Sequence, residues 1–216
     1  METLSLAARL RQCAVIPVLR LSTRAATEYA IDCLLDAGFQ TVEITLTTPD
    51  AVALIAQLRG RDLNGVLLGA GTVLDLDTAR RCLDAGADYL VSPGLVAGLA
   101  QVARDAGRAA LVGAFTPGEV LSAWHEGAEV VKIFPAATGG PSHLQALHAV
   151  YPEIPLCPTG GVSQTNMLDY FKAGASMVGV GNNIVDQTAL AARDRAGVIR
   201  HARAYLDLAR TLPQSQ

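Results

Sequence analysis

The sequence is poor in charged residues and especially poor in lysine. Charged side chains make up 17 % of the 216 residues, and Lys132 and Lys172 are the only lysines, beside fifteen arginines. The formal net charge of −3 argues against nucleic-acid binding, which calls for a basic surface. No apolar run approaches the roughly 20 residues that span a bilayer, so we expect no membrane association.

The sequence also lacks paired cysteines. Cys13, Cys33, Cys82 and Cys157 are scattered singly, without a CxxC pair, which argues against a disulfide framework or a metal site. We therefore expect a reducing, cytoplasmic setting and neither a metal nor another cofactor. Half of the residues are hydrophobic, which is typical of a globular protein, and we expect one domain over residues 1–216.

Short apolar runs alternate with amphipathic helical stretches, a pattern typical of parallel α/β folds. The eight predicted strands are Val15–Leu19, Thr41–Thr45, Gly65–Gly69, Tyr89–Val91, Ala110–Ala114, Val130–Phe134, Leu156–Thr159 and Met177–Val180. The predicted helices between and after them are Arg24–Ala37, Asp50–Arg59, Asp77–Ala85, Val96–Ala106, Pro117–Glu126, Ser142–Ala149, Gln164–Ala173 and Ala189–Arg210. Together with an extra N-terminal helix within Met1–Arg11, this pattern favours a (β/α)8 TIM barrel. The alternative, a doubly wound open sheet, usually has fewer strands.

Lys132 interrupts one of these predicted strands. Its neighbours, from Val130 to Phe134, are β-branched or aromatic and are typical of a buried strand. A buried ammonium group is costly unless it is paired or loses its proton. A neutral lysine amine is a nucleophile that forms Schiff bases with carbonyl substrates, whereas arginine stays protonated. The position therefore predicts that the amine itself is used.

Glu43 is a second polar residue within a predicted strand. Because side chains alternate along a strand, Glu43 and Thr45 share the face opposite Val42 and Ile44. One explanation is a structural ion pair with Arg20, which follows the first strand. The other is a proton carrier for Schiff-base chemistry, since an apolar pocket raises the pKa of a carboxyl group towards neutral pH. A buried lysine in the same barrel favours the second explanation.

Two glycine-rich turns follow the last two predicted strands. They are Gly160-Gly161, after Pro158-Thr159, and Gly181, before Asn182-Asn183. Backbone without side chains lets N–H groups approach an anion, and the loops after strands seven and eight commonly bind phosphate in TIM barrels. Neither turn matches a P-loop or a dinucleotide-binding motif, so ATP and NAD are not expected.

Five motifs, taken together and in order, resemble the class I 2-keto-3-deoxy-6-phosphogluconate (KDPG) aldolases. They are Glu43–Leu46, Gly69–Leu74, Val91–Gly94, Val131–Ala136 and Pro158–Val162, and the similarity extends from about Val15 to Ile184. The resemblance implies a (β/α)8 barrel, a homotrimer, and metal-independent cleavage of KDPG to pyruvate and glyceraldehyde 3-phosphate.

The resemblance also implies roles for individual residues. Lys132 corresponds to the Schiff-base lysine and Glu43 to the general acid/base. Some members have an arginine where this sequence has Thr47, whereas others have one at the end of the first strand, so Arg20 is assigned to the pyruvate carboxylate. The implied substrate-binding set is Arg20, Thr72, Pro93, Phe134, Thr159, Gly160, Gly161, Gly181 and Asn182.

The sequence leaves alternatives for the substrate and the reaction. The same chemistry would suit the galactonate epimer of KDPG or 4-hydroxy-2-oxoglutarate, which lacks phosphate. A phosphosugar epimerase or isomerase would use Lys132 only as an electrostatic group. A non-catalytic phosphate-binding barrel would leave Lys132 and Glu43 unexplained.

Overall fold

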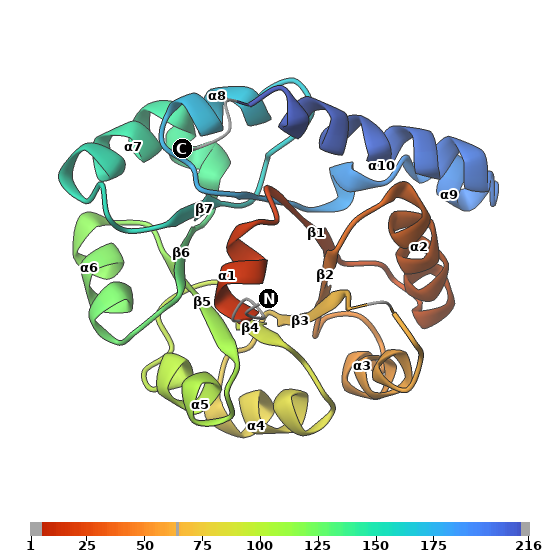
Figure 1. Ribbon diagram of the computed structural model, residues 1–216, viewed down its shortest axis with the longest axis horizontal. Helices are drawn as coiled ribbons and strands as arrows, with labels where there is room; N and C mark the ends of the chain where they lie inside the picture. Colours follow the sequence, from red (N-terminus) through yellow and green to blue (C-terminus); the bar gives the residue numbers. More distant parts are fainter. Residues whose placement is uncertain (1–5, 64, 213–216) are drawn as a thin grey trace, which may run out of the picture.

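Eight parallel strands alternate with helices along the chain and form a ring around a common axis (Figure 1). The computed structural model describes residues 6–63 and 65–212. The strands are β1 (Val15–Leu19), β2 (Thr41–Thr45), β3 (Leu67–Gly71), β4 (Tyr89–Val91), β5 (Ala109–Ala114), β6 (Val130–Ile133), β7 (Leu156–Pro158) and β8 (Val178–Val180). Hydrogen bonding follows the order β7-β6-β5-β4-β3-β2-β1-β8. A parallel bridge between Thr159 and Gly179 joins the two ends, which gives the predicted (β/α)8 TIM barrel.

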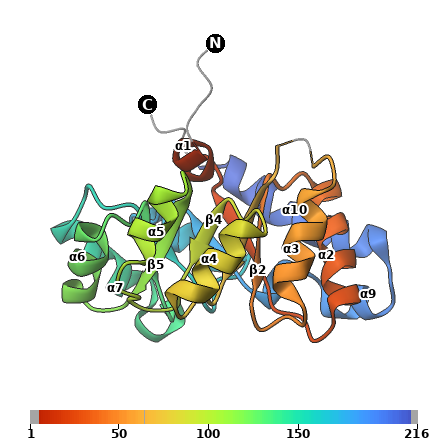
Figure 2. The same cartoon turned by 90° about the horizontal axis from the view of Figure 1, so that it is seen from below.

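Helices surround the strands and carry the chain from the end of one strand to the start of the next. They are α1 (Leu6–Arg11), α2 (Arg24–Ala37), α3 (Ala51–Arg59), α4 (Leu76–Asp84), α5 (Leu99–Asp105), α6 (Pro117–His125), α7 (Ala136–Val150), α8 (Met167–Lys172), the 3₁₀ helix η1 (Asn182–Ile184), α9 (Gln187–Ala191) and α10 (Arg195–Arg210). Helix α1 lies across one mouth of the barrel (Figures 1 and 2). Its Leu10 packs inside, against Ile16, Leu67 and Met177 from the first residues of strands or just before them. Apolar side chains therefore fill the N-terminal mouth, and the loops that follow the strands surround the opposite mouth.

The strand residues divide into two buried sets because alternate side chains point to opposite faces. The outer set, which includes Val42, Ile44, Val131 and Ile133, packs against the helices. The inner set fills the barrel and comprises Ile16, Val18, Leu67, Tyr89, Val91, Ala109, Leu111, Val130, Cys157 and Met177, with Leu10 from α1. Glu43 and Lys132 alternate with outer-set neighbours, so both point into the barrel. This placement is what the alternation in the sequence predicts.

Several predicted element bounds differ from those observed, and three of the differences are informative. β3 begins and ends two residues later than predicted, because it starts at Leu67 and continues past Gly69 to Gly71. The predicted helix over Ala189–Arg210 is two helices, α9 and α10, separated at Arg193, whose φ is 54°. α7 begins before the predicted Ser142, with a break at Gly140, where φ is 66° and ψ is −172°. Of the predicted N-terminal helix, residues 6–11 form α1, and residues 1–5 lie outside the described part.

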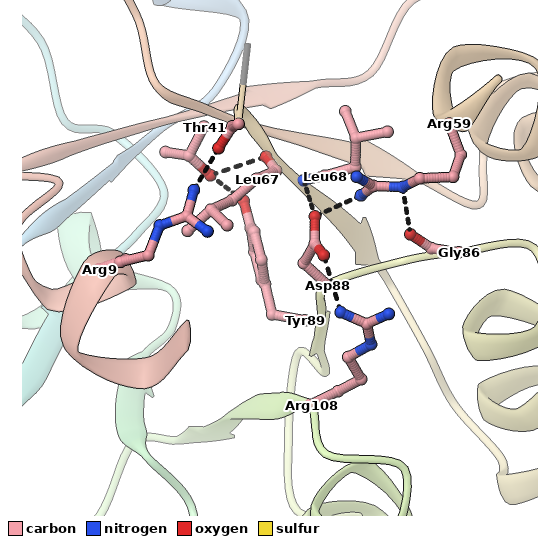
Figure 3. Close-up of polar contacts among 10 residues, drawn as sticks. Arg9, Thr41, Arg59, Leu67, Leu68, Gly86, Asp88, Tyr89 and Arg108 are labelled. Atoms are coloured by element: carbon pink, nitrogen blue, oxygen red, sulfur yellow. Dashed lines mark hydrogen bonds and ion pairs between the residues drawn. The ribbon is translucent and has the colours of Figure 1, made fainter. Parts of the chain in front are cut away.

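A buried carboxylate ties neighbouring strands together on the outside of the barrel (Figure 3). Asp88, just before β4, accepts hydrogen bonds from the backbone N–H of Leu68 at 2.9 Å and from Arg108 Nη1 at 3.0 Å. Arg59 Nη2 also donates to it, while Arg59 Nε donates to the Gly86 carbonyl at 3.0 Å. Three N–H groups therefore donate to the Asp88 carboxylate, as a buried charge requires.

We expect Asp88→Asn to lower the free energy of unfolding by about 2–3 kcal/mol, because it places an amide donor against arginine donors in a buried position. Equilibrium urea denaturation measures this change. The matched control is Asp169→Asn, which removes an exposed pair with Lys172. That change should cost less than about 0.5 kcal/mol. Equal effects of the two substitutions would contradict the structural role of Asp88.

Candidate active site

Lys132 lies on the inner face of β6 and is 5 % exposed. Its register partners are Gly113 on β5 and Cys157 on β7, so small side chains flank the amine. Nζ lies 5.2 Å from the centre of the Phe134 ring, which follows on the same face. Within the described part of the chain, no ion pair within 4.0 Å includes Lys132. The amine is therefore buried beside an aromatic ring without a carboxylate holding it.

Glu43 points into the same barrel from the middle of β2 and is 2 % exposed. Its Oε1 is buried and has no hydrogen-bond partner among the described residues. On the neighbouring strand β3, a Cβ at Gly71 would overlap this oxygen and the carbons below it. A glycine at position 71 is therefore needed to make room for the Glu43 carboxyl group. The alternative explanation for Glu43, a structural ion pair with Arg20, is not observed, since neither residue belongs to an ion pair among those described.

The electrostatic surroundings of Glu43 suit a proton carrier. Burial raises the pKa of its carboxyl group, whereas the positive charges of Lys132 and, to a smaller extent, Arg20 lower it. Burial is the larger effect, so the pKa lies above the usual glutamate range. Burial also raises the pKa of the Cys157 thiol, which lies next to Lys132 on β7, to about 12. Cys157 is therefore a neutral neighbour, and Glu43 is the ionisable partner of the amine.

Polar groups surround the open mouth above Glu43 and Lys132. Arg20 is exposed directly after β1. Thr72, directly after β3, has a φ of 63°, which is a strained conformation for a β-branched residue. Below it on β2, Thr45 Oγ1 donates to the Leu19 carbonyl at 3.0 Å and lies 2.8 Å from Thr47 Oγ1. A guanidinium group and several hydroxyl groups thus border the site, as the binding of a carboxylate requires.

The two glycine turns lie side by side at this mouth, because Thr159 and Gly179 bridge β7 and β8. Gly160 and Gly161 have φ values of 91° and 87°. A Cβ at Gly160 would lie 3.2 Å from the Phe134 ring, and one at Gly161 would overlap Ala137 at the start of α7. Gly181 precedes η1, in which Asn182 is exposed. The turns therefore lie next to the Lys132 site, on the Phe134 side.

Pro93 lies at the mouth on the opposite side, after β4. A Cβ at Gly113 would overlap the backbone of Pro93 and Gly94, so this loop packs directly on β5. Ser92 holds the loop in place: its Oγ donates to the Gly94 carbonyl at 2.7 Å and accepts from the Gly113 N–H at 3.2 Å. Glu43 and Lys132 lie within β2 and β6, and the other predicted site residues lie in the loops that follow the C-terminal ends of the strands. This is the end of the barrel where TIM-barrel active sites are found.

Sequence reasoning missed the inner-face residues that give the site its shape. Gly71 makes room for Glu43, Gly113 makes room for the Pro93 loop, and Tyr89 fills the barrel close to Glu43. The alternation that placed Glu43 inside also places these residues inside. A search of every strand in the phase of Glu43 and Lys132 would have found them.

A large cavity lies at the other end of the barrel, with a volume of about 910 Å³. Its cations are Arg11, Lys172 and Arg210, each of which has an acidic partner within 4.0 Å. His148 and Phe171 complete much of the wall. Since conserved chemistry in TIM barrels lies at the C-terminal mouth and these charges are already balanced, we do not assign this cavity to the active site.

A sequence model of the KDPG and KHG aldolases matches residues 6–201 of the chain. The chain belongs to the KDPG and KHG aldolase family. Membership of an aldolase family argues for a lyase and against the epimerase or isomerase and the non-catalytic barrel.

Relatives within the family differ in their named substrate. The chain is 34 % identical over 171 residues, 79 % of its length and 81 % of the relative's, to a probable 2-dehydro-3-deoxy-6-phosphogalactonate aldolase of Rhizobium meliloti. It is 33 % identical over 198 residues, 91 % and 90 % of the two lengths, to a 2-dehydro-3-deoxy-phosphogluconate aldolase of Pseudomonas aeruginosa. Membership of the family therefore identifies an aldolase but does not decide between the phosphogalactonate and phosphogluconate substrates.

Solved structures of the family have the same fold. The KDPG aldolase of Legionella pneumophila, crystallised with pyruvate captured as a covalent carbinolamine intermediate, superposes with a TM-score of 0.83 at 27 % identity. The match covers 92 % of this chain and 97 % of that one. Within the described ranges, none of the helices has the length and apolar character needed to cross a membrane.

Proposed function

We propose that the protein is a class I, metal-independent aldolase that cleaves KDPG to pyruvate and glyceraldehyde 3-phosphate through a Schiff base on Lys132. The observation that carries the proposal is the pairing of two buried groups on one inner face: an amine without a carboxylate partner and a carboxyl group whose pKa is raised by burial. The covalent carbinolamine of the Legionella pneumophila relative supports it.

The reaction begins when the Lys132 side chain gives a proton to the Glu43 carboxylate and the resulting amine adds to the C2 carbonyl of the keto acid. Glu43 donates a proton to the carbinolamine hydroxyl group, which leaves as water and produces an iminium ion. This cation withdraws electrons from the C3–C4 bond, which breaks as Glu43, directly or through water, removes the proton of the C4 hydroxyl group. The aldehyde leaves, the enamine takes up a proton, and hydrolysis releases pyruvate and restores the amine.

The remaining site residues hold the two ends of the substrate. Arg20 and Thr72 bind the carboxylate, with Pro93 and Phe134 lining the pyruvyl pocket and Thr159 bordering it. The backbone of Gly160, Gly161 and Gly181, with Asn182 beside it, binds the distal phosphate. Binding energy from the phosphate end orients the reacting carbon near the amine.

The test is reduction with borohydride in the presence of pyruvate, followed by peptide mass mapping. We expect a reduced pyruvyl adduct on Lys132. The sequence offers a built-in comparison because its other lysine, Lys172, lies on α8 and pairs with Asp169 at 3.0 Å. An adduct confined to Lys172, or none at all, would overturn the Schiff-base mechanism.

Phosphate recognition favours KDPG or its galactonate epimer over 4-hydroxy-2-oxoglutarate. Two hydrogen bonds to a charged group, at about 1.5–3 kcal/mol each, correspond to roughly 10²–10⁴-fold in kcat/KM. We expect a loss of this size when KDPG is replaced by its analogue without the phosphate. Gly161→Ala, which strains the turn against Ala137, should reduce kcat/KM for KDPG but not for the analogue. Equal use of both substrates by the unmodified enzyme would favour 4-hydroxy-2-oxoglutarate instead.

We also propose that the enzyme assembles as a homotrimer in a cytoplasmic setting. Leu74 and Leu95, in the loops after the neighbouring strands β3 and β4, are 62 % and 44 % exposed. Exposed apolar side chains on adjacent loops suit burial against another subunit. Light scattering coupled to size-exclusion chromatography should give three times the chain mass of 22.5 kDa. A mass equal to that of the single chain would contradict the trimer.

A further inference from the structure

Tyr89, on β4, occupies the interior of the barrel, and its ring extends towards Thr41 on β2, the strand that also carries Glu43 (Figure 3). From β4, its ring crosses the neighbouring strand β3 at Gly69, where a Cβ would overlap the ring. Its hydroxyl oxygen lies 2.8 Å from Thr41 Oγ1 on β2. Thr41 precedes Glu43 by two residues, so the two side chains share a face. The tyrosine therefore spans three strands and ends one layer below the Glu43 carboxyl group.

Hydrogen bonding holds the ring in this position. Thr41 Oγ1 donates to the Leu67 carbonyl at 3.2 Å, so its lone pairs accept the hydrogen bond from the Tyr89 hydroxyl group. This satisfies both hydroxyl groups within the fold. Around the ring, the inner set of side chains is apolar apart from these hydroxyl groups. The Tyr89 ring thus fills the space below Glu43, and its hydrogen bond to Thr41 keeps it in place.

We propose that Tyr89 is a positioning residue for Glu43: its ring excludes water from the lower side of the carboxyl group and keeps that group raised towards the mouth beside Gly71. The inference rests on the proposed role of Glu43 as the acid/base. Tyr89 does not itself transfer protons, because burial and the nearby Glu43 charge place its pKa well above the usual tyrosine range.

Among the described residues, the charges that act on the Glu43 carboxyl group come from the mouth and the opposite wall of the barrel. They are Lys132 from β6 and Arg20 from the end of β1, which lower the pKa of Glu43 but are outweighed by burial. The titratable groups from β4 and β7, Tyr89 and Cys157, stay neutral because burial raises the pKa of each. Burial is therefore the factor that keeps the pKa of Glu43 high, and the Tyr89 ring lies on the lower side of Glu43, over its register partner Gly69.

The experiment compares Tyr89→Leu with Tyr89→Phe and with Phe39→Leu. Phe39 is buried in the outer core, so its replacement is a matched loss of aromatic volume away from Glu43. One measurement is a ¹³C NMR titration of the Glu43 carboxyl group, assigned by the signal that Glu43→Gln removes. The other is the acid limb of the pH profile of kcat/KM, which reports the ionisation of an essential base.

We expect Tyr89→Leu to admit water below Glu43 and lower its pKa by about one unit or more, since full burial shifts carboxyl groups by up to several units. The acid limb should move to lower pH by the same amount. Tyr89→Phe keeps the ring and should shift the pKa by less than about 0.3 units. Phe39→Leu should lower the melting temperature without moving either titration.

An unchanged Glu43 pKa in folded Tyr89→Leu would overturn the inference, whatever the kinetics show. A lowered pKa with an unmoved acid limb would support the role of Tyr89 but contradict the proposed acid/base role of Glu43. If Tyr89→Leu does not fold, Gly69→Ala replaces it, because a methyl group there would overlap the Tyr89 ring and displace it. An unchanged Glu43 pKa in that variant overturns the inference equally.

Discussion

Lys132→Arg is expected to lower kcat for aldol cleavage by a factor on the order of 10⁴–10⁶, the size of loss that follows removal of a covalent nucleophile. The substitution keeps a positive charge near its place on the inner face of β6, next to Gly113 and Cys157. A guanidinium group stays protonated and cannot add to a carbonyl carbon. The coupled assay of pyruvate release measures the loss, and borohydride should trap no pyruvyl adduct on this variant.

Lys172→Arg is the matched control. Lys172 is near the end of α8, its side chain is 75 % exposed, and it pairs with Asp169 within the same helix. Arginine can make the same pair, so we expect kcat and the melting temperature to stay unchanged. Circular dichroism should show that both variants fold. A folded Lys132→Arg enzyme that keeps more than a tenth of the activity would exclude a mechanism that depends on the amine.

Glu43→Gln is expected to lower kcat by roughly 10²–10⁴, the usual contribution of a positioned acid/base. Glutamine has nearly the same shape and can occupy the space beside Gly71, but it can neither give nor accept the proton that the carbinolamine and the C4 hydroxyl group exchange. The acid limb of the pH profile should disappear together with the activity. Glu129→Gln, which alters a half-exposed carboxylate 3.8 Å from Arg11, is the control and should leave kcat unchanged.

The same substitution should make the protein more stable at neutral pH. Burial raises the pKa of Glu43 in the folded state, so the favourable contribution of the protonated carboxyl group is full at low pH and is lost as the pH rises through the folded-state pKa. Glutamine stays neutral at every pH. The melting temperature of Glu43→Gln should therefore exceed that of the unmodified enzyme at pH 7 and approach it near pH 4. A lower melting temperature of Glu43→Gln at pH 7 would contradict a raised folded-state pKa for Glu43.

Much of the fold could be predicted because it follows from local periodicity. Alternating apolar runs identify the strands, and helix stops such as Ala37-Gly38 are marked by glycine, whose φ at Gly38 is 103°. The error at β3 has a tertiary cause. Gly71 has low strand propensity, yet it is the last residue of β3, where the carboxyl group of Glu43 occupies the space beside it. Propensity could not reveal a requirement set by other strands.

The division of the last predicted helix also depends on a contact from far along the chain. The sequence around Arg193 is rich in alanine and suits a continuous helix. In the folded protein, Tyr29 on α2 donates a hydrogen bond to the Arg193 carbonyl at 2.8 Å, and its ring lies 5.6 Å from the Arg193 guanidinium carbon. Asp194 then caps α10 by accepting from the Gly197 N–H at 3.0 Å.

The sequence by itself determined which residues carry unusual chemistry: a lysine and a glutamate within apolar strands, and glycine turns after the last two strands. Their phase along each strand was enough to place them inside a barrel. Only the tertiary structure decided how they act together. Closure of the barrel leaves Lys132 without a carboxylate partner, keeps Glu43 from pairing with Arg20, and places Tyr89 below it. The reason is physical: the pKa of a group and the contacts around it depend on the side chains that several strands bring to one point, whereas periodicity reports only the spacing along a single strand.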